Sequence, residues 1–281
     1  MNSIEWIRSR CITTAAISCI LAVSALVGGA AAEEGEVNLS FKPIEGKVLN
    51  YETKWTIETN FMGMDIVQNQ NYKAIVQLSK VTEDGQFKME LQFPEVKSSM
   101  LIDDEMREWA PPIQLVGKNV FAYVTTEGEV EKVEPGGYIP GMKSPEDLTS
   151  IIEIWFIKLP DRVVKIGETW REDVNENDEG NEGQPGIEGY VDFTLVKIEK
   201  KQDIEVAVIE TKAELKINQS TPQGMLDADA KGKSKYYIAI DGGYIVETKQ
   251  TFEMKGKVIA EGTGDETDAA MTRTYETKLK K

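Results

Sequence analysis

The sequence contains no histidine, and its two cysteines, Cys11 and Cys19, both lie near its start. The absence of histidine removes the usual general base of serine and cysteine hydrolases and the commonest protein ligand of transition metals. Because the chain has no thiol after residue 32, that part forms no disulfide and no zinc site of the cysteine or histidine type. We therefore expect a non-enzymatic protein with no catalytic residues, no metal and no other cofactor.

Long apolar runs are also scarce, and the clearest one is Ala15–Val27. Arg8 and Arg10 precede this run, and small residues follow it up to Ala32, which is the pattern of a secretory signal peptide over residues 1–32. The run of about 13 residues is shorter than the roughly 20 needed to span a bilayer. We therefore predict an exported protein, periplasmic or extracellular, whose mature form does not span the membrane. Lipid attachment at Cys19 is the alternative.

Basic residues are few: the sequence has 32 of them against 48 acidic residues, so its formal net charge is −16. A body with this charge repels nucleic acids and anionic membrane surfaces over about one Debye length. We therefore expect no nucleic-acid partner, and we attribute the acidity to solubility outside the cell.

The clearest pattern in the remaining sequence is an alternation of apolar and polar residues with a period of two. Phe87–Phe93 alternates without a break, and Val246–Val258 places apolar residues mostly on one face and charged residues on the other. Turn residues separate such segments at Glu83–Gly85, Glu127–Gly128 and Asp241–Gly243. The pattern predicts a mainly β protein with long, curved antiparallel sheets, shaped as a half-barrel or a clam, solvated on one side.

One segment has the period of a helix instead. Ser144 and Pro145 are typical of a helix start, and apolar residues follow at helical spacing up to Leu159. We predict an amphipathic helix of about four turns that ends before Pro160 and packs on a sheet.

A weak internal repeat divides the chain. Leu78–Val81 followed by Phe87–Met89 matches Leu195–Ile198 followed by Ile204–Val206. This suggests an N-terminal β half over residues 33–134, a helical connector over 135–159 and a C-terminal β half over 160–281. Whether the halves share one core or form two is left open by the sequence.

Several motifs occur in a characteristic order: Lys80–Gly85, Gly117–Phe121, Leu159–Pro160, Gly167–Trp170 and the hairpin at Asp241–Gly243. In this order they resemble a family of exported bacterial proteins with an uncharacterised β-rich domain, over roughly Lys42 to Val258. That family has no assigned activity, so the resemblance implies no catalytic residue. The architecture is also similar to the half-barrel of bacterial lipoprotein carriers, which hold acyl chains, although a shared fold does not establish a shared function.

Aromatic and aliphatic residues on the predicted inner faces are candidates for the wall of an apolar ligand cavity between sheet and helix. They are Trp55, Phe87, Leu91, Ile152, Trp155, Trp170, Phe193 and Phe252. The alternative is that these residues simply fill the core.

Three functions are compatible with the sequence. The first is a non-catalytic protein that binds an apolar small molecule or lipid between sheet and helix. The second is a structural or interaction module of the cell envelope, whose partner is another envelope protein. The third is an enzyme that uses carboxylates alone, and only the abundance of acidic residues favours it.

Overall fold

The computed structural model describes residues 35–103, 105–107, 113–142, 144, 146–153, 155–176, 186–221 and 224–280. The predicted signal peptide, residues 1–32, lies outside this part of the chain. In the described residues the protein is mainly β, with long antiparallel strands and one short helix. The predicted fold class is therefore confirmed.

The first half of the chain contributes seven strands and the helix to the described structure. They are β1 (Glu36–Leu39), β2 (Val48–Phe61), β3 (Met64–Leu78), β4 (Gln86–Ile102), β5 (Glu105–Arg107), β6 (Asn119–Thr125), β7 (Val130–Pro135) and α1 (Glu146–Glu153). The second half contributes β8 (Arg162–Lys165), β9 (Thr169–Glu176), β10 (Ile187–Lys201), β11 (Ile204–Thr221), β12 (Gly224–Ala239), β13 (Ile245–Ile259) and β14 (Glu266–Lys280).

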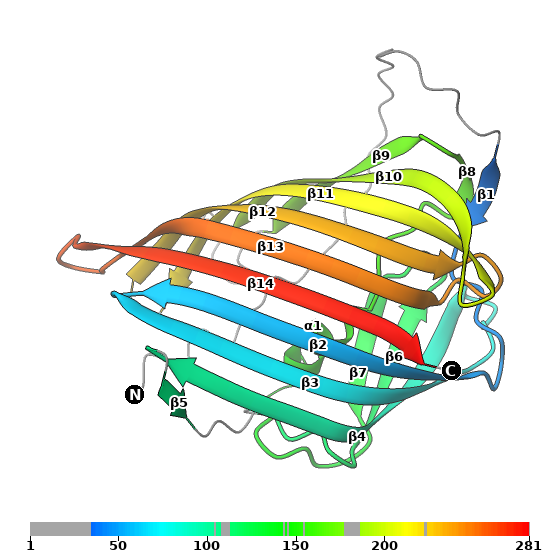
Figure 1. Ribbon diagram of the computed structural model, residues 1–281, viewed down its shortest axis with the longest axis horizontal. Coiled ribbons are helices and arrows are strands. Elements are labelled where there is room, and N and C mark those ends of the chain that lie inside the picture. Colours follow the sequence, from blue (N-terminus) through cyan, green and yellow to red (C-terminus); the bar gives the residue numbers. More distant parts are fainter. Residues whose placement is uncertain are drawn as a thin grey trace.

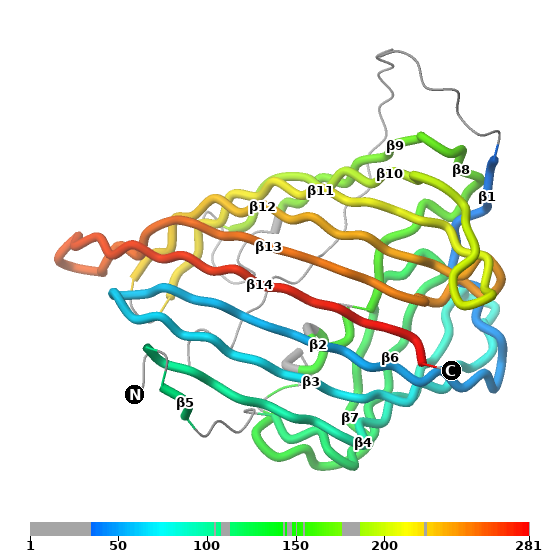
Figure 2. Tube along the Cα trace, viewed as in Figure 1, coloured from blue at the N-terminus to red at the C-terminus, as the bar shows by residue number. Residues whose placement is uncertain are grey.

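Nearly all of these strands form one open, curved sheet (Figures 1 and 2). Its strand order is β7-β6-β4-β3-β2-β14-β13-β12-β11-β10-β9, and β5 pairs with β4 beside this path. Each neighbouring pair is antiparallel, and β1 and β8 form a separate two-stranded sheet. Helix α1 lies behind the large sheet in Figure 1. We call the face of the sheet that α1 covers the inner face.

The alternation of side chains sets the two faces of the sheet. In β4, Phe87, Met89, Leu91 and Phe93 are buried, as the sequence predicts, while Lys88 and Glu90 between them are partly exposed. The predicted hairpin at Asp241–Gly243 is also present, since β12 pairs with β13 across it. Gly242 and Gly243 have φ angles of 100° and 68° there, a backbone that glycine adopts without steric cost.

The first and last long strands, β2 and β14, pair with each other in the middle of the sheet. β14 pairs with β2 from Ala269 opposite Phe61 to Lys280 opposite Asn50. This pairing joins the strands that precede α1 to those that follow it, so one sheet continues through both predicted halves. We call the β2–β14 contact the seam.

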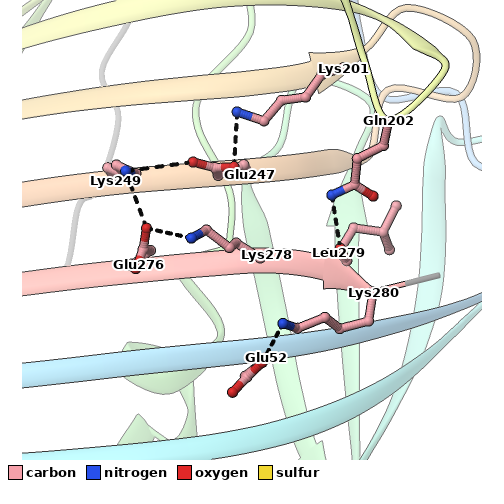
Figure 3. Close-up of polar contacts among 9 residues, drawn as sticks. All are labelled: Glu52, Lys201, Gln202, Glu247, Lys249, Glu276, Lys278, Leu279 and Lys280. Carbon is pink, nitrogen blue, oxygen red and sulfur yellow. Dashed lines mark hydrogen bonds and ion pairs between the residues drawn. The ribbon is translucent and has the colours of Figure 1, made fainter.

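Charged side chains bridge the strands on the outer face beside the seam (Figure 3). Glu247 on β13 contacts Lys201 at 2.8 Å and Lys249 at 3.9 Å, and Lys249 continues to Glu276 on β14 at 3.3 Å. Lys249 and Glu276 stay largely exposed, and a pair of this kind contributes about 0–1 kcal/mol. Glu247 is buried, with a side chain only 10% exposed, so its contact with Lys201 is partly shielded from water. Together these contacts link β10, β13 and β14 on the outer face.

The main core lies between the inner face, α1 and the segment that follows α1. It includes Leu91 and Val120 from the first half, Val208 and Ile238 from the second, and Ile152 from α1. The two halves therefore share one principal hydrophobic cluster. A second, smaller cluster lies further along β9–β14 and β2, and we call it the second cluster.

The helix is shorter than the four turns predicted. It ends at Glu153, and the backbone N–H groups of Trp155 and Phe156 bond three residues back, to Ile152 and Glu153. Leu159 then donates its N–H to the carbonyl oxygen of Glu127, in the β6–β7 turn. Contacts with other parts of the protein thus replace helical hydrogen bonds after Glu153. These contacts outweigh the local helical pattern of the sequence.

Candidate ligand cavity on the inner face

A cavity of about 420 Å³ lies between the inner face of β9–β14 and the chain around α1. One wall is the end of α1 and the segment after it, represented by Glu153, Phe156 and Ile157. The cavity falls within the roughly 300–1,000 Å³ that small-molecule sites occupy. It is much larger than a hollow between Phe41, Tyr51 and Trp155, which holds only about 30 Å³.

The cavity floor is hollow where small side chains on adjacent strands leave space unfilled. The cross-strand register aligns Val191, Ala213, Gly232, Phe252 and Arg273 in one row across β10–β14, and all five line the cavity. We call this the central row. Gly232 is not in the left-handed region, so the backbone does not require glycine at this position. An added Cβ would lie 3.2 Å from Cβ of Ala213 and 3.6 Å from Cδ2 of Phe252.

A second row beside the central row is polar. The same register aligns Phe193 with Thr211, Ser234, Gln250 and Tyr275, which also line the cavity. We call the last four residues the polar row. Hydroxyl and amide groups can donate and accept hydrogen bonds, so this side of the cavity suits a polar group of a ligand.

The opposite side of the central row is apolar. Val191 and Phe252 pack against the second cluster, which contains Val174 and Leu215 from the cavity lining. Polarity therefore changes across the floor, from the polar row through the central row to an aliphatic surface.

Arg273 brings a positive charge to the cavity floor. Its guanidinium carbon lies 4.9 Å from the ring centroid of Tyr275 and 5.8 Å from that of Phe252. The side chain is half-buried. At these distances both rings attract the guanidinium through cation–π interaction.

An ion pair lies in the cavity wall. Nζ of Lys158, in the segment after α1, is 3.8 Å from Oε1 of Glu172 on β9, and both side chains are about one-fifth exposed, at 20% and 22%. Burial raises the pKa of Glu172, while Lys158 acts in the opposite direction and Glu127 and Glu129 add to the increase. Desolvation therefore outweighs the attraction of the lysine.

Five of the eight residues predicted to line a cavity belong to the main core, and all of these except Phe193 lie away from the large cavity. Leu91 and Ile152 are almost fully buried there. Phe87 and Trp155 border the small hollow of about 30 Å³. Trp155 packs 5.2 Å from Tyr51 and donates its indole N–H to the Tyr72 hydroxyl at 3.3 Å.

Phe193 and the three remaining predicted residues lie at or beside the large cavity. Phe193 and Phe252 line it. Trp170 stacks on Phe193 at 5.4 Å with an interplanar angle of 8°, and Trp55 stacks on Tyr275 at 6.1 Å. The two indoles thus support the rings that form the cavity wall.

The polar row and Arg273 were not singled out from the sequence. Their signal is weak but present: Gln250 occupies an inward position in the mostly apolar face of Val246–Val258. A polar residue at an inward strand position indicates either a core hydrogen bond or a site.

Two features are absent from the described part of the chain. No three histidine, cysteine or carboxylate side chains there are grouped so that they could hold a metal ion. No helix there is long and apolar enough to cross a membrane.

Comparison with known proteins gives a likeness of fold. No protein-family model and no curated protein matches the chain. A solved structure of lipovitellin, described in terms of its lipid–protein interactions, aligns with 85% of this chain at a TM-score of 0.51 and 10% identity. The alignment covers 25% of the lipovitellin chain, so this protein spans about a quarter of that structure.

A DUF1329 family protein from Desulfovibrio piger, also 10% identical, covers 82% of this chain and 85% of its own. Its TM-score is 0.17, which carries no weight for the fold. The resemblance to an exported bacterial family therefore stays a prediction.

Proposed function

We propose that this protein is a non-catalytic carrier or receptor for an apolar or lipid-like ligand, which it holds in the cavity on the inner face. The observation that supports this most strongly is the cavity of about 420 Å³ floored by Ala213 and Gly232, where larger side chains would fill the space. Closely packed interiors contain few voids larger than a water molecule, so a hollow of this size is unusual for a purely structural sheet.

The fold supports the same proposal. Lipovitellin, whose described structure concerns lipid–protein interactions, has a similar sheet over 85% of this chain. At 10% identity the likeness extends to the fold alone, so the lipid of that protein is not assigned to this one. Export to the periplasm or the exterior, and removal of residues 1–32, are part of the proposal.

A neutral apolar fluorophore tests the proposal. N-phenyl-1-naphthylamine brightens when it leaves water, and it carries no charge that would favour or oppose Arg273. We expect saturable binding to the purified full chain, with displacement by long-chain alcohols. Fluorescence that rises linearly without saturation, or that long-chain alcohols leave unchanged, would contradict the proposal.

A second candidate is an interaction module of the cell envelope. The open edges at β7 and β9 of the described sheet favour it, since an edge strand can pair with a strand of another protein. This candidate predicts no apolar cargo, so the fluorophore titration separates it from the first.

A further inference from the structure

The charges around the cavity narrow the class of ligand. The charged side chains of its lining are four carboxylates and two cations: Glu129, Glu153, Glu172, Asp173, Lys158 and Arg273. Lys158 pairs with Glu172, and the guanidinium of Arg273 lies over two neighbouring aromatic rings. Both cations thus interact within the protein, and acidic groups outnumber basic ones around the cavity.

Glu172 shows how the cavity wall treats a carboxylate. It lies on β9 opposite Val191, so it extends the central row by one strand. Burial raises its pKa more than Lys158 lowers it, and Glu127 and Glu129 add to the increase. A carboxylate is therefore disfavoured here even beside a lysine. The head group of an anionic ligand would meet the same desolvation and the same repulsion.

An uncharged hydrogen-bonding group is present at Thr211 of the polar row. Thr211 lines the cavity and is only 7% exposed. Among the described residues its hydroxyl makes no hydrogen bond, whereas Ser234, opposite it on β12, is hydrogen-bonded to Tyr236. Buried polar groups are ordinarily hydrogen-bonded, and a hydroxyl both donates and accepts. Thr211 therefore suits a neutral ligand group such as an alcohol or a carbonyl.

Thr211 is close enough to the acidic wall for a charge on the ligand to matter. It lies on β11, two strands from Glu172 on β9, which is about 10 Å at the usual strand spacing of about 4.8 Å. This distance is about one Debye length in physiological salt, and buried charges are screened less than exposed ones. A negative head group at Thr211 would thus be repelled by the wall.

The remainder of the cavity suits a hydrocarbon chain. Val191, Ala213 and Phe252 supply the apolar part of the central row, and Val174 and Leu215 lead into the second cluster. A volume of about 420 Å³ lies near the lower end of the usual range for small-molecule sites, which fits one chain better than a lipid with several.

We infer that the ligand is a single-chain amphiphile with an uncharged, hydroxyl-bearing head that hydrogen-bonds Thr211, and that the carboxylates of the wall reject its anionic counterparts. The inference rests on the proposed function and adds the class of ligand. Long-chain alcohols and monoacylglycerols belong to this class, whereas ionised fatty acids do not.

The first test needs no variant. It compares dodecanol, 1-dodecanoylglycerol and dodecanoate as competitors of bound N-phenyl-1-naphthylamine at pH 8, each below its aggregation limit. We expect the two neutral amphiphiles to bind at least about tenfold more tightly than dodecanoate. A carboxylate also interacts more strongly with water than an alcohol does, so variants assign the difference to the wall.

The double variant Glu129→Gln/Glu172→Gln removes two of the four negative charges. It should raise the affinity for dodecanoate relative to dodecanol by about tenfold. The matched control is Glu188→Gln/Glu261→Gln, which makes the same change in net charge at exposed positions outside the lining. The control should keep the ratio within about twofold. An equal change in both double variants, or no change in either, would overturn the role of the wall.

Thr211→Val removes the hydroxyl and keeps the shape of the side chain. The affinity for dodecanol relative to N-phenyl-1-naphthylamine, which has no hydroxyl, should fall about threefold to tenfold. Thr211→Ser retains a hydroxyl and should preserve more of the preference than Thr211→Val. If Thr211→Val keeps the preference of the wild type, the head-group assignment is wrong.

The outcomes separate the two proposals. Dodecanoate that binds as tightly as dodecanol, or more tightly, overturns the uncharged head group and leaves the proposed function standing. Failure of the fluorophore and of all three competitors to bind overturns the proposed function as well.

Discussion

Thr53 on β2 and Thr277 on β14 share a hydrogen bond of 3.0 Å between their hydroxyl oxygens, although 224 residues separate them. Both side chains are buried, at 0% and 2% exposure. The bond lies on the seam, where the first and last long strands pair. The continuity of the sheet through both halves therefore includes a polar contact that water does not reach.

The two threonines should be coupled in their effect on stability. Thr277→Val leaves the Thr53 hydroxyl buried with a lost partner, and we expect a loss of about 1–3 kcal/mol in the free energy of unfolding. The double variant Thr53→Val/Thr277→Val should lose less than the sum of the single variants, because no hydroxyl of the pair remains. Urea denaturation of the four proteins measures the coupling, and strict additivity would show that the bond contributes nothing specific.

Trp155 should be among the most sensitive positions of the core. It is 5% exposed, stacks on Tyr72 at 6.3 Å and fixes the segment after α1. Trp155→Ala should lower the free energy of unfolding by about 3–5 kcal/mol. Tyr138→Ala is the control, because Tyr138 is 81% exposed, and it should change stability by less than about 0.5 kcal/mol. Similar losses in both variants would contradict the packing described for Trp155.

Glu172 predicts a dependence of stability on pH. Burial raises its pKa in the folded protein, so its charged form opposes folding at neutral pH, and this effect disappears as the pH falls below the raised value. Glu172→Gln should therefore be more stable than the wild type near pH 8, and its advantage should vanish towards pH 4. Thermal unfolding across this range provides the measurement.

Glu276 supplies a control of opposite sign. Hydrogen bonds to Lys278 and Lys249 hold the pKa of Glu276 below its usual value. Its charge therefore stabilises the fold above the unfolded-state pKa, and this contribution is lost as the pH falls through the lowered value. Glu276→Gln should reduce stability near pH 8 and have little effect in acid. If both variants shift stability in the same direction, the electrostatic account of Glu172 is wrong.

Filling the cavity should abolish binding without unfolding the protein. Ala213→Leu adds apolar volume to the central row at a site that already carries a Cβ. We expect N-phenyl-1-naphthylamine affinity to fall at least about tenfold while the melting temperature stays the same or rises, because the added atoms occupy empty space. Ser234→Leu repeats the test from the next strand.

Thr274→Leu is the matched control for the cavity variants. Thr274 is exposed and lies between Arg273 and Tyr275 on β14, so its side chain points to the outer face. Binding should be unchanged. Equal loss of affinity in Ala213→Leu and Thr274→Leu would place the fluorophore elsewhere on the protein.

Local patterns explain which parts of this architecture could be predicted. The alternation in Phe87–Phe93 predicts a strand, and the glycines at 242 and 243 predict a hairpin. Both signals depend on neighbouring residues only, and both predictions are confirmed. The predicted length of α1 is wrong because Trp155 contacts Tyr51 and Tyr72, which are distant in sequence. The pairing of β2 with β14 at the seam could not be predicted either, since no local signal in the sequence pairs Thr53 with Thr277.

The candidate site shows the same limit. Large apolar residues such as Phe252 and Leu91 have similar patterns, yet Phe252 lines the cavity and Leu91 fills the core. The difference depends on which strand faces the segment after α1. The hollow itself comes from small residues, Ala213 and Gly232, whose significance appears only when the register places them side by side.

Native mass spectrometry of the protein as its own host produces it, purified without detergent and then extracted with solvent, tests the central claim most directly. The account predicts a reproducible mass increment over the polypeptide, which extraction releases as a defined apolar or lipid-like molecule. A bare polypeptide mass, together with no saturable binding of N-phenyl-1-naphthylamine, would contradict it.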